Sequence, residues 1–308
     1  CSFPHGGGIM EVTVRVPATS ANIGPGFDTL GIAFSLYNTF EFAQTEQGLS
    51  FSGCDEKYKN EHNLCYVAYK KVAEAADKEI GGLRISTISC DVPIARGLGS
   101  SATLIAAGAV AANAILDCGF SKYELLKICS PIEGHADNLT PAIFGGFTAC
   151  MTHNEHLFST PLHISKKLDF FALVPDFEVK TSVARSILPK AFSREDAVYN
   201  ISHTAFLMQG MATGNMRFLS VAANDMLHQP YRSGLIHGYE EAKDAAKRAG
   251  APVFFISGSG STCICIAKKD AGKDVASRLK ERFSSLPNNW KVYPLSVDEN
   301  GATITKII

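Results

Sequence analysis

The sequence contains no stretch that approaches the roughly eighteen uninterrupted apolar residues of a membrane-spanning helix. It also contains no run of five or more charges of one sign, and its 29 Lys and Arg nearly balance its 30 Asp and Glu. These absences argue against a membrane-spanning protein and against a broad nucleic-acid-binding surface, so an anionic ligand would need a local site. With 308 residues, 46% of them hydrophobic, the chain is expected to be a soluble globular protein of about two domains.

No two of the nine cysteines form a CxxC pair, and their number is odd. Several of them lie in apolar runs, where free cysteine behaves as a small core residue. This usage argues against a zinc site or a disulfide framework, and it predicts reduced thiols in a cytoplasmic protein.

The first residues lack the basic and apolar regions of a signal peptide. Met10 looks like a natural start, so residues 1–9 are interpreted as an expression remnant. The rest of the chain shows no internal repeat and no low-complexity segment.

Hydrophobic patterns divide the chain into two units that mix α and β elements. In the first, at 10–165, Val12, Val14 and Val16 alternate with polar residues and predict a strand. Ser121 and Glu124 have the spacing of a capping box, which predicts a helix to about residue 130. The other elements predicted here are extended segments at 30–36, 38–43 and 83–91, helices at 63–80 and 104–116, and a strand at 147–152.

The second unit, at 166–308, opens with an apolar strand at 170–174. The elements predicted after it are several helices between about 196 and 248, strands at 253–256 and 263–267, a helix at 271–283, and strands near Val292 and Ile304. The order β, α, β, β, α, β resembles a ferredoxin-like domain. The predicted fold class is α+β, with two domains and a cleft between them.

The most informative stretch is a glycine-rich loop at 91–103, between a predicted strand and a predicted helix. Gly97 and Gly99 let the backbone approach a ligand, and Ser100 and Ser101 offer hydroxyl groups. The helix that follows points free N–H groups and the positive end of its dipole at the loop. The loop is neither GxxxxGK[ST] nor GxGxxG. Its residues favour a di- or triphosphate ligand, the alternative being a plain turn with a serine cap.

The pattern Pro-x-x-x-Gly-Leu-Gly-Ser-Ser-Ala at 93–102 resembles the phosphate loop of the galactokinase, homoserine kinase and mevalonate kinase (GHMP) family. The resemblance implies the two-domain GHMP kinase fold, with an N-terminal ATP-binding domain, and the use of ATP with Mg²⁺. It implies Mg²⁺ binding by Ser100 and Glu133, although without the motif Glu133 is also typical of an exposed charge at a helix end. It also implies ATP binding by the loop residues Pro93, Ile94, Ala95, Arg96, Gly97, Leu98, Gly99, Ser100, Ser101, Ala102 and Thr103.

Further motifs are similar to those of the homoserine kinases within this family. They are PATSANIGPGFD at 17–28 and EGHADN at 133–138 with PAIFGGF at 141–147, while ISGSGST at 256–262 resembles the C-terminal glycine motif of the whole superfamily. The resemblance extends from Met10 onward. It implies transfer of the γ-phosphate of ATP to the side-chain hydroxyl of homoserine, giving O-phospho-L-homoserine for threonine biosynthesis. Ala136 and Ser261 stand where proline is frequent, which concerns only loop stiffness.

Phosphorylating an amino acid on its side chain requires a partner for the ammonium and a guanidinium fork for the carboxylate. The resemblance assigns the carboxylate to Arg185 and Arg232, the ammonium to Asp28, and a further substrate contact to Thr181. Without the motifs, each arginine is more typical of a solvated surface charge, and Asp28 is also typical of a turn cap.

Asn22 and Asn138 are expected to orient the substrate hydroxyl, or else simply to hold their loops. Asp137 and Asn138 are the predicted catalytic residues. A relative resembling mevalonate kinase would use such an aspartate as general base, whereas homoserine kinases manage largely by positioning and charge stabilisation, so both mechanisms stay open. His135 is more typical of a loop-structuring hydrogen bond than of proton transfer. Asn63 is expected either to hold the adenosine or only to cap its helix.

The alternative within the family is a kinase of mevalonate, a phosphorylated mevalonate or a sugar, which needs no carboxylate fork beside an ammonium partner. Outside it, the alternatives are a nucleotide-binding regulator without turnover and an α+β binding module whose glycine loops are turns. The predicted partners are homoserine and ATP, without nucleic acid or membrane. Whether the protein is a homodimer stays open.

Overall fold

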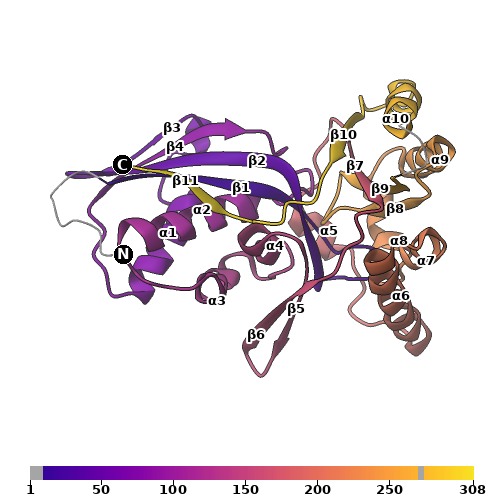
Figure 1. Ribbon diagram of the computed structural model, residues 1–308, viewed down its shortest axis with the longest axis horizontal. Helices are drawn as coiled ribbons and strands as arrows, with labels where there is room; N and C mark the ends of the chain where they lie inside the picture. Colours follow the sequence, from indigo (N-terminus) through magenta and orange to yellow (C-terminus); the bar gives the residue numbers. More distant parts are fainter. Residues whose placement is uncertain (1–9, 270–273) are drawn as a thin grey trace.

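The computed structural model describes residues 10–269 and 274–308. The interpreted expression remnant at 1–9 and the predicted helix start at 271–273 lie outside the described residues. Figure 1 shows two units side by side, one built on a long sheet and the other on a smaller sheet. None of the helices in the described part of the chain is long and apolar enough to cross a membrane.

The larger sheet grows from β1, Glu11–Ala21, and β2, Leu30–Thr45, which pair antiparallel. Val12, Val14 and Val16 are fully buried, as their alternation predicted. β2 runs without a break through the two segments that were predicted separately. The strand order is β11-β1-β2-β4-β3, and β5 and β6 continue from β2. The remaining strands are β3 (Leu49–Ser52), β4 (Gly82–Cys90), β5 (Phe147–His153), β6 (His156–Leu162) and β11 (Thr303–Ile307).

Helices pack on one side of this sheet (Figure 1). They are α1 (Leu64–Ala75), α2 (Ser100–Ile115), α3 (Lys122–Glu133) and α4 (Leu139–Phe144), and a short 3₁₀ turn, η1, spans Glu56–Tyr58. α2 is largely buried because alanine and Gly108 let its neighbours come close, and a Cβ on Gly108 would lie 2.0 Å from the carbonyl oxygen of Cys65. The capping box of Ser121 and Glu124 starts α3, as predicted.

The second unit holds an antiparallel sheet in the order β10-β7-β9-β8. Its strands are β7 (Leu168–Val174), β8 (Val253–Ile256), β9 (Cys263–Lys268) and β10 (Lys291–Leu295). Its helices are α5 (Thr181–Ser186), α6 (Arg194–Thr213), α7 (Met216–Ala222), α8 (Gln229–Arg232), η2 (Ser233–Leu235), α9 (Tyr239–Ala249) and α10 (Val275–Ser284). The β, α, β, β, α, β order of a ferredoxin-like domain is therefore present.

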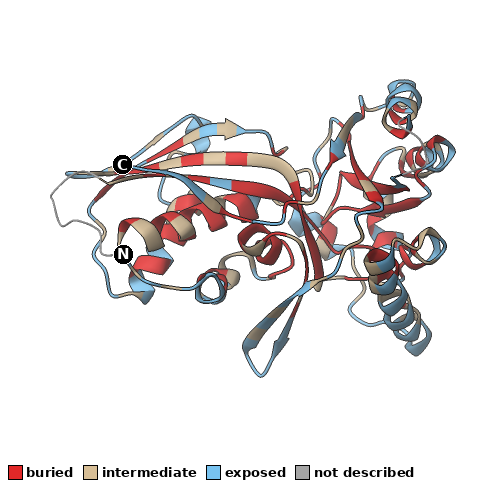
Figure 2. Cartoon of the chain, in the orientation of Figure 1, coloured by how far each residue is buried: buried red, intermediate tan, exposed pale blue. Residues whose placement is uncertain are grey.

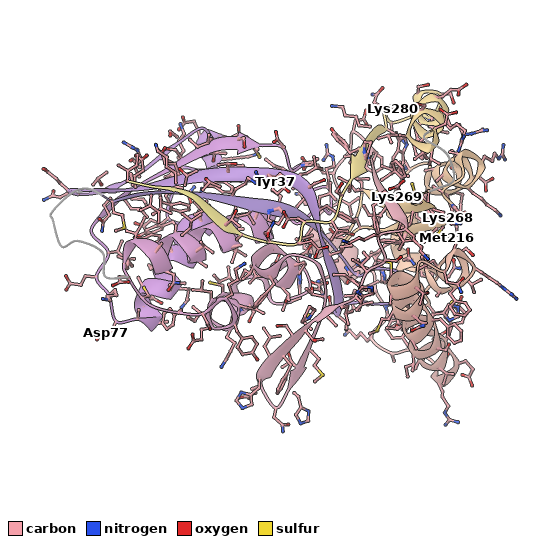
Figure 3. All side chains as sticks on the ribbon, in the orientation of Figure 1. Tyr37, Asp77, Met216, Lys268, Lys269 and Lys280 are labelled. Atoms are coloured by element: carbon pink, nitrogen blue, oxygen red, sulfur yellow. The ribbon has the colours of Figure 1, made fainter. Side chains whose placement is uncertain are left out.

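The end of the chain returns to the first unit. The strand near Ile304, which was predicted to belong to the second unit, is β11 and pairs with β1 of the larger sheet. On the way back, Asp298 accepts a hydrogen bond from the hydroxyl of Tyr37 at 2.9 Å, and Tyr37 is labelled on β2 in Figure 3. A hydrophobic pattern predicts a strand but not the sheet that it joins, which explains the error. The domain division at 10–165 and 166–308 stays a prediction.

One apolar cluster continues from the first unit into the second. It joins Ile32 and Phe34 of β2 to Phe170 of β7 and Phe255 of β8, and the rings of Phe34 and Phe170 lie 5.4 Å apart. Figure 2 shows buried residues running through this junction. Because this cluster is shared by the two units, its packing fixes the position of residues from one unit relative to those from the other.

Candidate active site

The predicted phosphate loop is pressed between β1 and the turn at 257–260. Gly99 is the N-cap of α2 with φ of +69°, and a Cβ there would lie 1.9 Å from Oγ1 of Thr19. Gly97 has φ of +78°, and its Cβ would lie 2.2 Å from the carbonyl oxygen of Ser257. Both positions therefore require glycine, for conformation as well as for space.

Two cavities meet at the start of α2. One has a volume of about 300 Å³ and the other about 590 Å³. Both are bordered by Leu64, Ala95, Ser100, Ser101 and Thr181. The free N–H groups and the positive dipole end of α2 favour an anion where the cavities meet.

The smaller cavity brings together most of the polar residues predicted from the motifs. Those that line it are Asn22, Glu133, Asn138, Thr181, Arg185 and Arg232, together with Ala95, Gly97, Gly99, Ser100 and Ser101 of the phosphate loop. Asp28 and Asp137 are not among the lining residues.

Arg232 is only 1% exposed although it carries a full charge. Its Nε donates to the carbonyl of Ala184 at 3.2 Å, and its Nη1 donates to the carbonyl of Gly258 at 2.9 Å. Among the described residues no carboxylate forms an ion pair with it. Burial, followed by the charge of Arg185, lowers the pKa of Arg232 to about 10. Nη1 of Arg232 also lies 3.5 Å from Nδ1 of His228. A buried guanidinium at a cavity wall with no carboxylate partner among the described residues favours an anionic ligand.

Arg185 and Asp28 form a bidentate ion pair. Nη1 lies 3.0 Å from Oδ2 and Nη2 lies 2.6 Å from Oδ1. Each side chain is 35% exposed. The resemblance assigned these residues to opposite ends of a substrate, and the structure pairs them with each other.

Asn22 is tied to both units by its side chain. Its Nδ2 donates to the carbonyl of Gly258 at 3.0 Å, and its Oδ1 accepts the backbone N–H of Asp28 at 2.8 Å. The same Gly258 carbonyl also accepts from Arg232. The glycine motif at 256–262 thereby fixes two of the predicted substrate-binding residues.

Glu133 ends α3, and its Oε2 is buried without a hydrogen-bond partner in the described structure. Burial raises the pKa of Glu133 to about 7. A carboxylate oxygen that is desolvated and unpaired is suited to bind a cation.

Asp137 is 1% exposed and supports its neighbours in the loop. Its Oδ1 lies 2.8 Å from Nδ1 of His135 and accepts the backbone N–H of Asn138 at 3.0 Å. Burial alone would lower the pKa of His135, but the hydrogen bond and charge of Asp137, with the charge of Glu133, outweigh it, so the pKa is raised. His135 lines the smaller cavity, whereas Asp137 is not among its lining residues.

Asn138 presents an amide to the smaller cavity. Its Oδ1 accepts a hydrogen bond from Oγ1 of Thr19 at 2.8 Å. Within residues 10–269 and 274–308 its Nδ2 makes no hydrogen bond, so a donor is left for a ligand. Thr181, at the start of α5, has its Oγ1 3.3 Å from Oγ of Ser259, another lining residue.

Five predicted loop residues line neither cavity, namely Pro93, Arg96, Leu98, Ala102 and Thr103. Arg96 reaches into the second unit, where its Nη2 donates to the carbonyl of Asp176 at 3.0 Å and its Nη1 lies 3.3 Å from a carboxylate oxygen of Glu178. Thr103 donates to the carbonyl of Ser100 at 2.7 Å. These side chains shape the loop and do not border the cavities.

Most of the residues that line the larger cavity were not predicted from the sequence. Of the predicted residues, Asn63, Ile94, Ala95, Ser100, Ser101 and Thr181 line it. Asn63 also caps α1 by accepting the N–H of Cys65 at 3.0 Å. Its position is therefore compatible with both predicted roles, capping the helix and contacting the adenosine. The other lining residues include Asn38, Phe40, Cys54, Lys57, Tyr58, His62, Thr87, Cys90, Leu104 and Val179. They come from several separate strands and loops, and no motif marks them.

Two family models match the chain. The model described as GHMP kinases N terminal domain matches residues 63–146, and the model described as GHMP kinases C terminal matches residues 207–285. The homoserine kinase of Clostridium beijerinckii is 43% identical over 294 residues, covering 95% of this chain and 98% of the relative. That of Clostridium botulinum is 40% identical over 293 residues, with the same coverage. The crystal structure of homoserine kinase from Cytophaga hutchinsonii superposes with a TM-score of 0.88, at 28% identity, over 99% of this chain and 100% of that chain.

Proposed function

The chain belongs to the GHMP kinase family, and we propose that it transfers the γ-phosphate of ATP to the side-chain hydroxyl of homoserine. Relatives at 40–43% identity over 95% of the chain carry the name homoserine kinase. The observation that carries the proposal is the smaller cavity, where the predicted phosphate loop and two arginines border one space of about 300 Å³.

ATP would occupy both cavities, with its phosphates at the start of α2. The larger cavity, lined in part by Phe40, Tyr58 and Leu104, offers apolar and aromatic surface for the adenine. Asn63 at its wall offers a polar contact to the nucleoside. The γ-phosphate would then point toward the smaller cavity, past Ser100 and Ser101.

The residues present fit a Mg²⁺ ion bound together with ATP. Glu133 supplies a buried, unpaired carboxylate oxygen, and Ser100 supplies a hydroxyl group on the wall of the same cavity. The described residues contain no group of three or more His, Cys, Asp or Glu arranged to hold a metal, so most ligands would come from phosphate and water, as is usual for this ion. When bound, Mg²⁺ would neutralise charge on the phosphates.

Homoserine would lie in the smaller cavity with its carboxylate on Arg185 and Arg232. Arg232 has no carboxylate partner in the described structure, and Arg185 has N–H groups directed at Asp28 that a substrate could share. The ammonium would then bind Asp28 at the edge of the site, and Thr181 would contact the substrate. Nδ2 of Asn138 would donate to the hydroxyl end, and Asn22 would hold this arrangement through Gly258.

Transfer would depend mainly on positioning and charge stabilisation, as phosphoryl transfer permits. Asp137 is not among the residues that line the cavity, and its Oδ1 is already engaged by His135 and the backbone of Asn138. Its Oδ2 is buried and has no hydrogen-bond partner in the described structure. The role of Asp137 would be to hold Asn138 and His135 at the cavity wall.

A cytoplasmic location is supported by eight free cysteines among the described residues. The homodimer stays a prediction, and a measurement of the protein's mass in solution would test it.

The experiment that tests the function is ATP consumption with homoserine, mevalonate, shikimate and galactose as separate acceptors. We expect turnover with homoserine and a product phosphorylated on the side-chain hydroxyl. Faster turnover with mevalonate or galactose would refute the homoserine assignment while leaving the family unchanged.

A further inference from the structure

The ring of Phe27 lies close to both arginines of the smaller cavity. The guanidinium carbon of Arg232 lies over its ring at 5.1 Å from the centroid, and that of Arg185 lies over it at 5.6 Å. The buried imidazole of His228 stacks on the same ring, with centroids 5.4 Å apart and an interplanar angle of 26°. Phe27 itself is half-buried and directly precedes Asp28.

Two guanidinium groups near one another repel, and here the charge of Arg185 contributes to lowering the pKa of Arg232. The face of an aromatic ring carries partial negative charge and attracts cations within about 6 Å of its centroid. Both arginines lie within this distance. The attraction itself uses none of their N–H donors. Nη2 of Arg232 makes no hydrogen bond among the described residues, and the donors that Arg185 gives to Asp28 can pass to a substrate carboxylate.

We propose that Phe27 is a positioning residue that holds Arg185 and Arg232 together as one carboxylate-binding fork. The proposal rests on the proposed function, because it concerns how that substrate's carboxylate is bound. His228, stacked on the ring and bonded through Nε2 to the carbonyl of Gly24 at 2.8 Å, keeps the ring itself in place.

The ring matters most when substrate enters. A substrate ammonium that binds Asp28 weakens the ion pair that holds Arg185 in the unliganded protein. The contact with Phe27 does not compete with substrate and stays in place throughout. It therefore preserves the spacing of the two guanidinium groups while Arg185 exchanges one carboxylate for another.

The first test replaces Phe27 by leucine, which keeps an apolar side chain without the ring. We expect the KM for homoserine to rise about tenfold, with the KM for ATP unchanged. The Ki of 3-aminopropan-1-ol, which is homoserine without its carboxylate, should stay within about twofold as a competitive inhibitor. Equal weakening of both compounds would mean that leucine only disturbs the pocket, and the proposal would be wrong.

The second test keeps the shape of the ring and changes its charge. Phe27 is replaced by phenylalanine carrying one, two or three fluorines, and Phe206 on α6, which lines neither cavity, receives the same series as control. We expect the KM for homoserine to rise with each fluorine at Phe27 and to stay constant at Phe206. A flat series at Phe27 in an enzyme that phosphorylates homoserine overturns the proposal. A wild-type enzyme inactive on homoserine would instead refute the proposed function, and the role of Phe27 would fall with it.

Discussion

Replacing Glu133 by glutamine tests whether the site holds a buried carboxyl group whose ionisation costs free energy in the absence of a cation. Burial raises the pKa of Glu133 from its ordinary 4.5 to about 7, and its Oε2 has no hydrogen-bond partner in the described structure. Ionising it in the folded protein therefore costs free energy. The gap between the two pKa values corresponds to about 3 kcal/mol.

The sign follows from proton binding. Between about pH 4.5 and about pH 7 the folded state holds a proton on Glu133 that the unfolded state has released. The free energy of unfolding therefore falls as the pH rises through this window, and the loss is complete above about pH 7. Glutamine cannot ionise, so the variant should lack this part of the pH dependence.

The assay is urea unfolding of the ligand-free wild type and of Glu133→Gln, from pH 4 to pH 8. We expect the stability of the variant relative to the wild type to increase by about 3 kcal/mol across that range. Glu281→Gln, at an exposed position on α10, is the control and should follow the wild type. A difference in stability between Glu133→Gln and wild type that does not change with pH would refute the reasoning.

If Glu133 also binds Mg²⁺, the stabilised variant should turn over much more slowly at saturating ATP and Mg²⁺.

Three further predictions follow from contacts in the site. Gly99→Ala should abolish ATP binding by isothermal calorimetry while most of the fold survives in circular dichroism, because its Cβ would lie 1.9 Å from Thr19 Oγ1; normal binding would contradict the loop geometry. Asp137→Asn should lower kcat less than about tenfold with an unchanged pH profile, whereas a loss of a hundredfold or more would identify a general base. Arg185→Ala and Arg232→Ala should each raise the KM for homoserine far more than that for ATP, by an amount set by lost charge-assisted bonds of about 1.5 to 3 kcal/mol each. Weakened ATP binding alone would exclude the arginines from the substrate site.

Much of the fold was predictable because the elements that carry the site have strong local signals. The alternation of Val12, Val14 and Val16 marked β1, and the capping box of Ser121 marked α3. The elements that were missed lack such signals. α4 is six residues long with Pro141 inside it, and β3 has only four residues. The pairing of β11 with β1 depends on how the whole chain folds back, which a local pattern does not contain.

The site divides in the same way. Residues inside contiguous motifs, such as Ser100, Glu133 and Asn138, were predicted and line the smaller cavity. Residues of the larger cavity, such as Phe40 and Val179, come from distant segments and look like ordinary strand and loop residues in the sequence. Motif membership also does not say which way a side chain turns. That of Arg96 turns toward Asp176 and Glu178 of the second unit and lines neither cavity.

The ion pair between Asp28 and Arg185 adds a reason for preferring a zwitterion. A ligand with both an ammonium and a carboxylate can separate the pair and give each member a new partner, so no charge is left alone. A carboxylate ligand without an ammonium, such as mevalonate, would take Arg185 and leave Asp28 unpaired. Both side chains are 35% exposed, so water would offset part of this loss and the cost should be about 1 kcal/mol, or about fivefold in affinity. Asp28→Asn should remove this penalty, so we expect the variant to lose affinity for homoserine and to narrow its preference over a carboxylate analogue without the amino group. An unchanged preference would show that the pair plays no part in selecting the substrate.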